Sequence, residues 1–154
     1  MARRHASLIP LSHQHQHALA LAVIIRRRFG IERGEGLWRE EQVEKMQKAW
    51  EAELKGHFEV EETLLFPEME RQLGKLPLVA ELLRDHVSVR GLVQLLKRSS
   101  EIPLLDGFSA LLEAHVHKEE RQLFAEFEKK MPPEEARKLG QEIEARLRKV
   151  CPRL

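Results

Sequence analysis

Two ten-residue segments, HFEVEETLLF at positions 57–66 and HVHKEERQLF at positions 115–124, repeat one pattern 58 residues apart. Each has a histidine four residues before a glutamate, then a second glutamate, and ends in Leu-Phe. Residues i and i+4 of an α-helix lie one above the other on the same face. His57 with Glu61, and His115 with Glu119, can therefore reach one site from two helices.

The spacing of apolar residues around these segments predicts four long helices, over 13–29, 38–66, 78–98 and 103–130. We expect Ser12 to cap the first helix, Gly30 to stop it, and Pro67 to end or kink the second. A charged fifth helix, Glu134 to Val150, should pack outside the others. The predicted fold is all-α: an up-down-up-down four-helix bundle over about 12–131 with an additional C-terminal helix, forming a single domain over 1–154.

Composition excludes several classes of protein. Lys and Arg number 26 against 25 Asp and Glu, so the net charge of +1 offers no strong field for nucleic acid or an anionic membrane. No apolar stretch approaches the roughly 20 residues that span a bilayer, and Arg3 and Arg4 are not followed by the apolar core of a signal peptide, which favours a cytoplasmic protein. With Cys151 as the single cysteine, a metal must use nitrogen and oxygen ligands.

Two further histidines, His15 and His86, lie on apolar helix faces. Each has a leucine four residues before it and an apolar pair six and seven residues after it. Antiparallel helices return about as many residues as they advance, and nine residues separate both His57 from Phe66 and Pro77 from His86. All four histidines are therefore expected at a similar depth in the bundle.

Imidazole nitrogen together with carboxylate oxygen suits iron, manganese or zinc, and one carboxylate can bridge two ions. A single His-x-x-x-Glu pair is more often a surface ion pair. Two matching pairs, aligned in depth with two apolar-face histidines, favour a metal, because unpaired buried charges cost several kcal/mol each. Glu62 and Glu120 are rotated about 100° from this face; they either orient imidazoles or are solvated carboxylates.

The chain resembles the hemerythrin-like family with the His-His-Glu (HHE) cation-binding domain, over about 11–127. The resemblance rests on LSHQHQHAL (11–19), HFEVEETLLFP (57–67), RDHVSV (84–89) and HVHKEERQLF (115–124). It implies a non-haem di-iron site inside a four-helix bundle, with two Fe ions that Zn or Mn could replace. The implied terminal ligands are His15, His57, His86 and His115, and the implied bridging ligands are Glu61 and Glu119.

The sequence departs from the oxygen carriers of that family at two places. They have a second histidine four residues after the one on the third helix, where this chain has Arg90. They also have an aspartate five residues after the histidine on the fourth helix, for which Glu119 substitutes at a spacing of four. One fewer imidazole implies an open coordination position, and with it a non-enzymatic protein that binds or senses O2 or a related small oxidant such as NO or peroxide.

Two alternatives remain open. The chain could be a di-iron enzyme of the oxidase or peroxidase type, or an iron-donor or repair protein, although ferritin-like enzymes use Glu-x-x-His with the carboxylate first. It could instead be a metal-free helical interaction module. Either a monomer or a homodimer is compatible with the sequence.

Overall fold

The computed structural model describes residues 3–151, and every regular element in that range is helical, as predicted. The α-helices are α1 (Ile9–Arg26), α2 (Glu35–Ala49), α3 (Lys55–Val60), α4 (Phe66–Leu73), α5 (Pro77–Leu95), α6 (Ile102–Lys118), α7 (Phe124–Lys130) and α8 (Pro133–Val150). Wider π-helical turns, Trp50–Leu54, Glu61–Leu65 and Glu119–Leu123, join α2 to α3, α3 to α4 and α6 to α7. Short 3-10 turns occupy Ala6–Leu8 and Ile31–Arg33.

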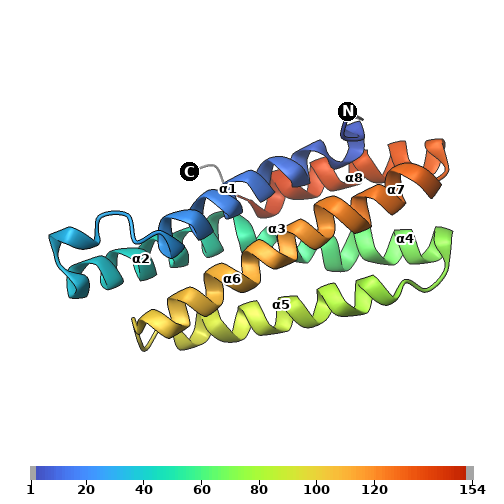
Figure 1. Cartoon of the computed structure of the whole chain (residues 1–154). Coiled ribbons are helices and arrows are strands. Elements are labelled where there is room, and N and C mark those ends of the chain that lie inside the picture. The colour runs from blue at the N-terminus through green and yellow to red at the C-terminus, as the bar shows by residue number, and fades with distance from the viewer. Residues whose placement is uncertain (1–2, 152–154) are drawn as a thin grey trace.

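The α-helices and π turns form long rods that run alternately in opposite directions (Figure 1). One rod is α1, the next is α2 through α4, the third is α5, and α6 continues into α7. Helix α6 packs along both α1 and α5, while α8 packs against α3 and the turn Ala6–Leu8. Within residues 3–151, no helix combines the length and the apolar character that crossing a membrane requires.

The ends of α1 differ from the prediction. The helix begins at Ile9 with Pro10 in its first turn, where the fixed φ of proline suits a helix start. Ser12 is therefore not the cap, and its hydroxyl donates to Glu120 Oε2 at 2.8 Å. The helix also ends at Arg26, before Gly30, because the chain turns through left-handed backbone at Arg28 (φ 58°) and Gly30 (φ 86°).

Pro67 does not end the second rod, which continues to Leu73. A proline in a helix interior lacks a hydrogen-bond donor and clashes with the carbonyl one turn back. Here the π turn Glu61–Leu65 comes directly before α4, so Pro67 falls in the first turn of the new α-helical segment. The sequence contains no evident signal for that wider turn.

The apolar core consists of two clusters, and each predicted ligand histidine lies on its helix between members of both. On α1, for example, His15 separates Leu11 of the first cluster from Ala18 of the second. On α5, His86 likewise lies between Leu82 and Val89. The core therefore surrounds one polar layer.

Helix α8 covers the outside of the rods near this layer, as expected for the fifth helix, and it buries its own apolar face. Gly56 permits the approach, since a Cβ there would lie 2.7 Å from Cys151 Sγ and 2.8 Å from the carbonyl oxygen of Val150. The C-terminal end of α8 thus lies directly against the residue that precedes His57.

Candidate metal centre

Six polar side chains form the layer between the two apolar clusters, and they are the six that the sequence singled out. None is more than 3% exposed. They are His15 of α1, His57 and Glu61 of the second rod, His86 of α5, and His115 and Glu119 of the α6–α7 rod.

Glu61 lies between two pairs of histidines. Its Oε2 is 3.2 Å from His57 Nε2 and 3.9 Å from His15 Nε2. Its Oε1 is 3.1 Å from His86 Nε2 and 3.9 Å from His115 Nε2. One oxygen of this carboxylate therefore faces each pair.

Glu119 divides its oxygens in the same way. Its Oε2 is 3.4 Å from His15 Nε2, and its Oε1 is 2.6 Å from His115 Nε2. The six residues consequently make two overlapping groups that share both glutamates, and within each group the potential ligand atoms lie within 4.8 Å of one another. One group adds His15 and His57, and the other adds His86 and His115.

Both shared glutamates begin a π-helical turn, Glu61–Leu65 and Glu119–Leu123. The sequence repeat is thus also a repeat of backbone geometry. Single π turns inside α-helices are rare and occur frequently at functional sites.

Hydrogen bonding leaves this cluster incomplete. Within the described residues, buried atoms without a hydrogen-bond partner include Glu61 Oε2, His115 Nε2 and both carboxylate oxygens of Glu119. A buried ionised oxygen without a partner costs several kcal/mol. Lone-pair donors of this kind, converging from the second rod and the α6–α7 rod, fit a bound cation.

The outer nitrogen of each imidazole has a partner of its own. His15 Nδ1 lies 2.6 Å from Glu120 Oε2, and His86 Nδ1 lies 2.6 Å from Glu62 Oε2. An ionised carboxylate can only accept, so Nδ1 donates and the lone pair of Nε2 faces inward. The geometry therefore favours the prediction that Glu62 and Glu120 orient imidazoles over the alternative that they are solvated carboxylates.

Two outer partners were missed by the sequence analysis. Asp85 Oδ2 lies 3.0 Å from His115 Nδ1, and Gln14 Oε1 lies 2.7 Å from His57 Nδ1. Asp85 immediately precedes His86 but contacts His115. Gln14 immediately precedes His15 but contacts His57. A polar residue next to each apolar-face histidine was the signal available in the sequence.

Arg90 occupies the position at which the oxygen carriers have an additional histidine, and it contacts Glu62 rather than the inner layer. Its Nη1 donates to Glu62 Oε2 at 2.7 Å, and its guanidinium lies 5.7 Å from the Phe58 ring centroid. Phe58 in turn stacks on His86 at 3.8 Å between ring centroids. Burial disfavours the ionised form of Glu62, but hydrogen bonds from His86 and Arg90 outweigh it and hold its pKa at about 2.

Two histidines of the inner layer, His15 and His115, hold a proton when no metal is bound. Burial disfavours charged His15, but the nearby Glu119 carboxylate and a hydrogen bond to Glu120 outweigh burial and raise its pKa to about 9. The pKa of His115 is also raised well above its usual value, against burial, mainly by the charge of Glu119. Burial likewise opposes ionised Glu61, yet the charge of His57 keeps the pKa of that carboxyl well below its usual range.

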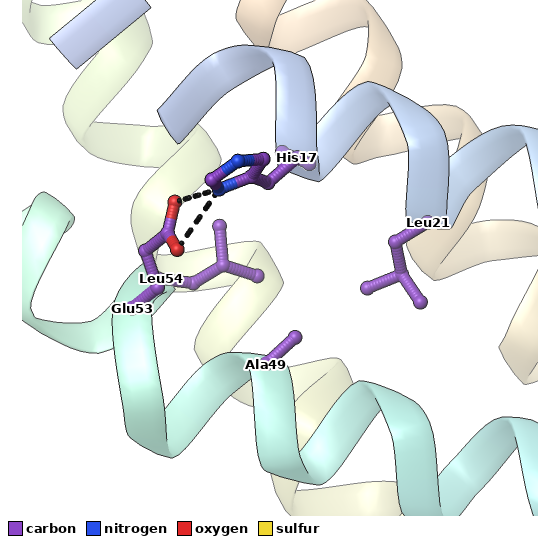
Figure 2. Close-up of a pocket in the computed structure, with 6 residues that line it drawn as sticks. His17, Leu21, Ala49, Glu53 and Leu54 are labelled. Atoms are coloured by element: carbon purple, nitrogen blue, oxygen red, sulfur yellow. Dashed lines mark hydrogen bonds and ion pairs between the residues drawn. The ribbon is translucent and has the colours of Figure 1, made fainter. Parts of the chain in front are cut away.

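An apolar pocket lies one helical turn from the centre, on the side of His15 and His57. Ala18, Leu21, Ala49 and Leu54 line it, and its volume is about 220 Å³. Figure 2 shows His17 and Glu53 joined at one end of this pocket, with Leu21 and Ala49 facing it. The distances from His17 Nδ1 to the two Glu53 oxygens are 2.9 and 3.1 Å.

The other histidines lie outside the cluster. His13 and His17 are exposed and His117 is half-buried, as expected from their spacing to the inner residues. His5, for which the sequence suggested no role, caps the first turn by accepting from the backbone N–H of Ser7 at 3.1 Å.

A match to one protein family agrees with this arrangement. No match to the chain was found among curated proteins or among solved structures. Residues 10–127 match the family described as the hemerythrin HHE cation binding domain. That range contains all six residues of the cluster and covers most of the chain. The chain therefore belongs to the hemerythrin HHE cation-binding domain family.

Proposed function

We propose that this protein binds two iron ions in the buried layer and uses them to bind or sense O2 or a related small oxidant, NO or peroxide. The observation that carries the proposal is the division of the two glutamates, each of which has one oxygen facing each histidine pair. A carboxylate placed in this way suits two cations better than one.

In this proposal each ion takes two histidines and one oxygen from each glutamate. His15 and His57 would hold the first ion, His86 and His115 would hold the second, and Glu61 and Glu119 would contribute to both. Ferrous ions at these positions would supply electrons and a coordination position for the small ligand. Zn or Mn would accept the same ligands, so metal availability also decides which ion is bound.

The surroundings suit a small, weakly polar ligand. Phe58, Phe66 and Phe124 are buried around the histidines, which limits water near the ions. The pocket of Figure 2 offers an apolar approach from the side of His15 and His57. Arg90, engaged with Glu62, does not fill the place of a missing imidazole, which supports an open coordination position.

We further infer that the rods form the up-down-up-down bundle expected from the sequence. The packing of α6 along both α1 and α5 supports this topology, as do the alternating directions in Figure 1. In such a bundle, side chains from facing helices build a site in the core.

The test is anaerobic loading with Fe2+, followed by optical spectra before and after addition of O2, NO or peroxide. We expect new charge-transfer absorption with at least one of these ligands, and its loss in His86→Ala. Spectra of the iron-loaded protein that none of the three ligands changes would contradict the proposal. A spectrum that reverses when O2 is removed would favour binding over chemistry.

A further inference from the structure

The four imidazoles of the layer differ in what their outer nitrogens contact. Three of them face a carboxylate oxygen: His15 faces Glu120, His86 faces Glu62, and His115 faces Asp85. His57 alone faces an amide oxygen, Gln14 Oε1, at 2.7 Å. The inner ligand types are the same in both halves of the centre, so the difference lies entirely outside it.

Each of the three carboxylates also contacts a cationic side chain, as the following distances show. Arg4 Nη2 lies 3.1 Å from Glu120 Oε1, Arg90 Nη1 lies 2.7 Å from Glu62 Oε2, and Lys118 Nζ lies 2.7 Å from Asp85 Oδ2. Each of these carboxylates therefore has a cationic partner in addition to its imidazole.

A carboxylate that accepts the outer N–H makes an imidazole a stronger metal ligand than a neutral acceptor does. The ion between His86 and His115 would therefore have two strengthened imidazoles. The ion between His15 and His57 would have one, because Gln14 carries no charge. Glu61 and Glu119 each direct one oxygen toward each position, so the inner ligand set does not offset this imbalance.

We propose that the two metal positions bind with unequal affinity, that the His15 and His57 position is the weaker, and that Gln14 sets the difference. The inference rests on the proposed metal centre and adds an order of filling to it. The stronger position fills first, and the weaker one loses its ion first. Gln14 acts through His57 and is a positioning residue.

Position 14 also allows the charge to be changed with little disturbance. Gln14 is half-buried and lines a surface groove of about 740 Å³ that Arg148 and Glu144 also line. Gln14→Glu keeps the shape of the side chain and adds one charge at the edge of this groove. Gln16→Glu adds the same charge on an exposed site of α1 and serves as the matched control.

The experiment is a titration with Co2+ alone, followed by calorimetry and visible absorption. We expect two steps in the native protein, with dissociation constants that differ by about 10- to 100-fold, the usual effect of an outer partner. Gln14→Glu should reduce this ratio by about 10-fold, and Gln14→Ala should increase it. Gln16→Glu should leave it unchanged.

Two ligand variants identify which position gives each step. His15→Ala should abolish the weaker step and keep the tighter one, whereas His86→Ala should abolish the tighter step. A second readout is the proton NMR spectrum of the Zn2+-loaded protein. The Nδ1 protons of three histidines should lie further downfield than that of His57, and Gln14→Glu should move the fourth toward them.

Several results would overturn the inference. Equal affinities in the native protein would do so, as would a ratio that Gln14→Glu and Gln14→Ala leave unchanged, or loss of the tighter step in His15→Ala. In these cases two ions still bind and the proposed centre stands. If no Co2+ binds at all, both the centre and the order of filling are wrong.

Discussion

The two copies of the repeated segment, 57–66 and 115–124, are alike on the inside of the bundle and different on the outside. Both present an imidazole and a carboxylate to the core, and both open into a π turn at the glutamate. Outside, His57 contacts the amide of Gln14, whereas His115 contacts the carboxylate of Asp85. The repeat thus specifies the inner layer, while residues of neighbouring helices set the properties of each half.

The strongest loss of metal binding is expected when either inner glutamate is replaced, which tests whether both copies of the segment contribute to both ions. Glu61→Gln and Glu119→Gln should each weaken binding of both ions, by more than the roughly 100-fold upper effect of an outer partner, because each glutamate faces both positions. The measurement is the number of metal ions retained per chain after gel filtration. Glu59→Gln, which loses an exposed ion pair with Arg146, is the control and should retain both ions.

If either glutamine variant lost only one ion, the glutamates would not be shared and the likeness of the copies would fail. An equal loss of both ions in the two variants would support the likeness of the copies.

A smaller effect is expected for the second glutamate of each copy. Glu62→Gln removes the charged acceptor from His86, and Glu120→Gln removes it from His15. Each should weaken one ion by about 10- to 100-fold, and the two variants should affect different steps of a metal titration. Identical titration curves for both variants would contradict the assignment of these carboxylates to different ions.

Position 56 provides a comparison in stability. The first copy is preceded by buried Gly56 and the second by exposed Ala114. Gly56→Ala should lower the free energy of unfolding by about 1–3 kcal/mol through overpacking, because its Cβ would meet Cys151 Sγ at 2.7 Å. Ala114→Gly should cost only about 1 kcal/mol of helix propensity.

Urea denaturation of the metal-free protein measures both changes. An unchanged stability of Gly56→Ala would indicate that the end of α8 can move away from α3 at little cost.

The smallest expected effect concerns protons. The pKa of His15 is raised from 6.5 to about 9, so this imidazole is protonated in the metal-free protein at pH 7.5. A metal binds only the neutral imidazole, so binding should release about one proton from His15, with a further contribution from His115. Calorimetry in buffers of different ionisation enthalpy at pH 7.5 measures this release.

The same protonation affects the stability of the metal-free protein in the opposite direction to its effect on metal affinity. A raised pKa in the folded chain stabilises the metal-free protein below pH 6.5, and this contribution is lost as the pH rises through about 9. Metal affinity should therefore increase over the same range in which metal-free stability decreases. A metal affinity independent of pH between 6.5 and 9 would contradict the protonation of the inner layer.

Much of this arrangement could be predicted from the sequence. The i, i+4 spacing of His57 and Glu61 fixes their common face on any helix, and the copy at His115 and Glu119 repeats it. The apolar neighbours of His15 identified its buried face. These are local properties of a helix, and the structure brings all of these residues together.

Other features depend on packing between helices and have no local pattern. Gln14 serves His57 only because α1 lies beside the second rod, and no spacing within either segment encodes that contact. The π turn at Glu61 likewise has no recognised signal in the sequence, which therefore predicts that Pro67 ends or kinks the helix. Ser12 has the residue type of a helix cap. Its actual partner, Glu120, is more than a hundred residues away in sequence, so no local pattern indicates that contact.

We propose that one chain holds two iron ions between its shared glutamates. The most direct test is metal analysis, combined with Mössbauer spectroscopy, of protein reconstituted anaerobically with 57Fe2+ and freed of excess metal. We expect two iron ions per chain in the native protein and a marked loss of iron in Glu61→Gln. One iron or fewer in the fully reconstituted native protein would contradict the di-iron proposal.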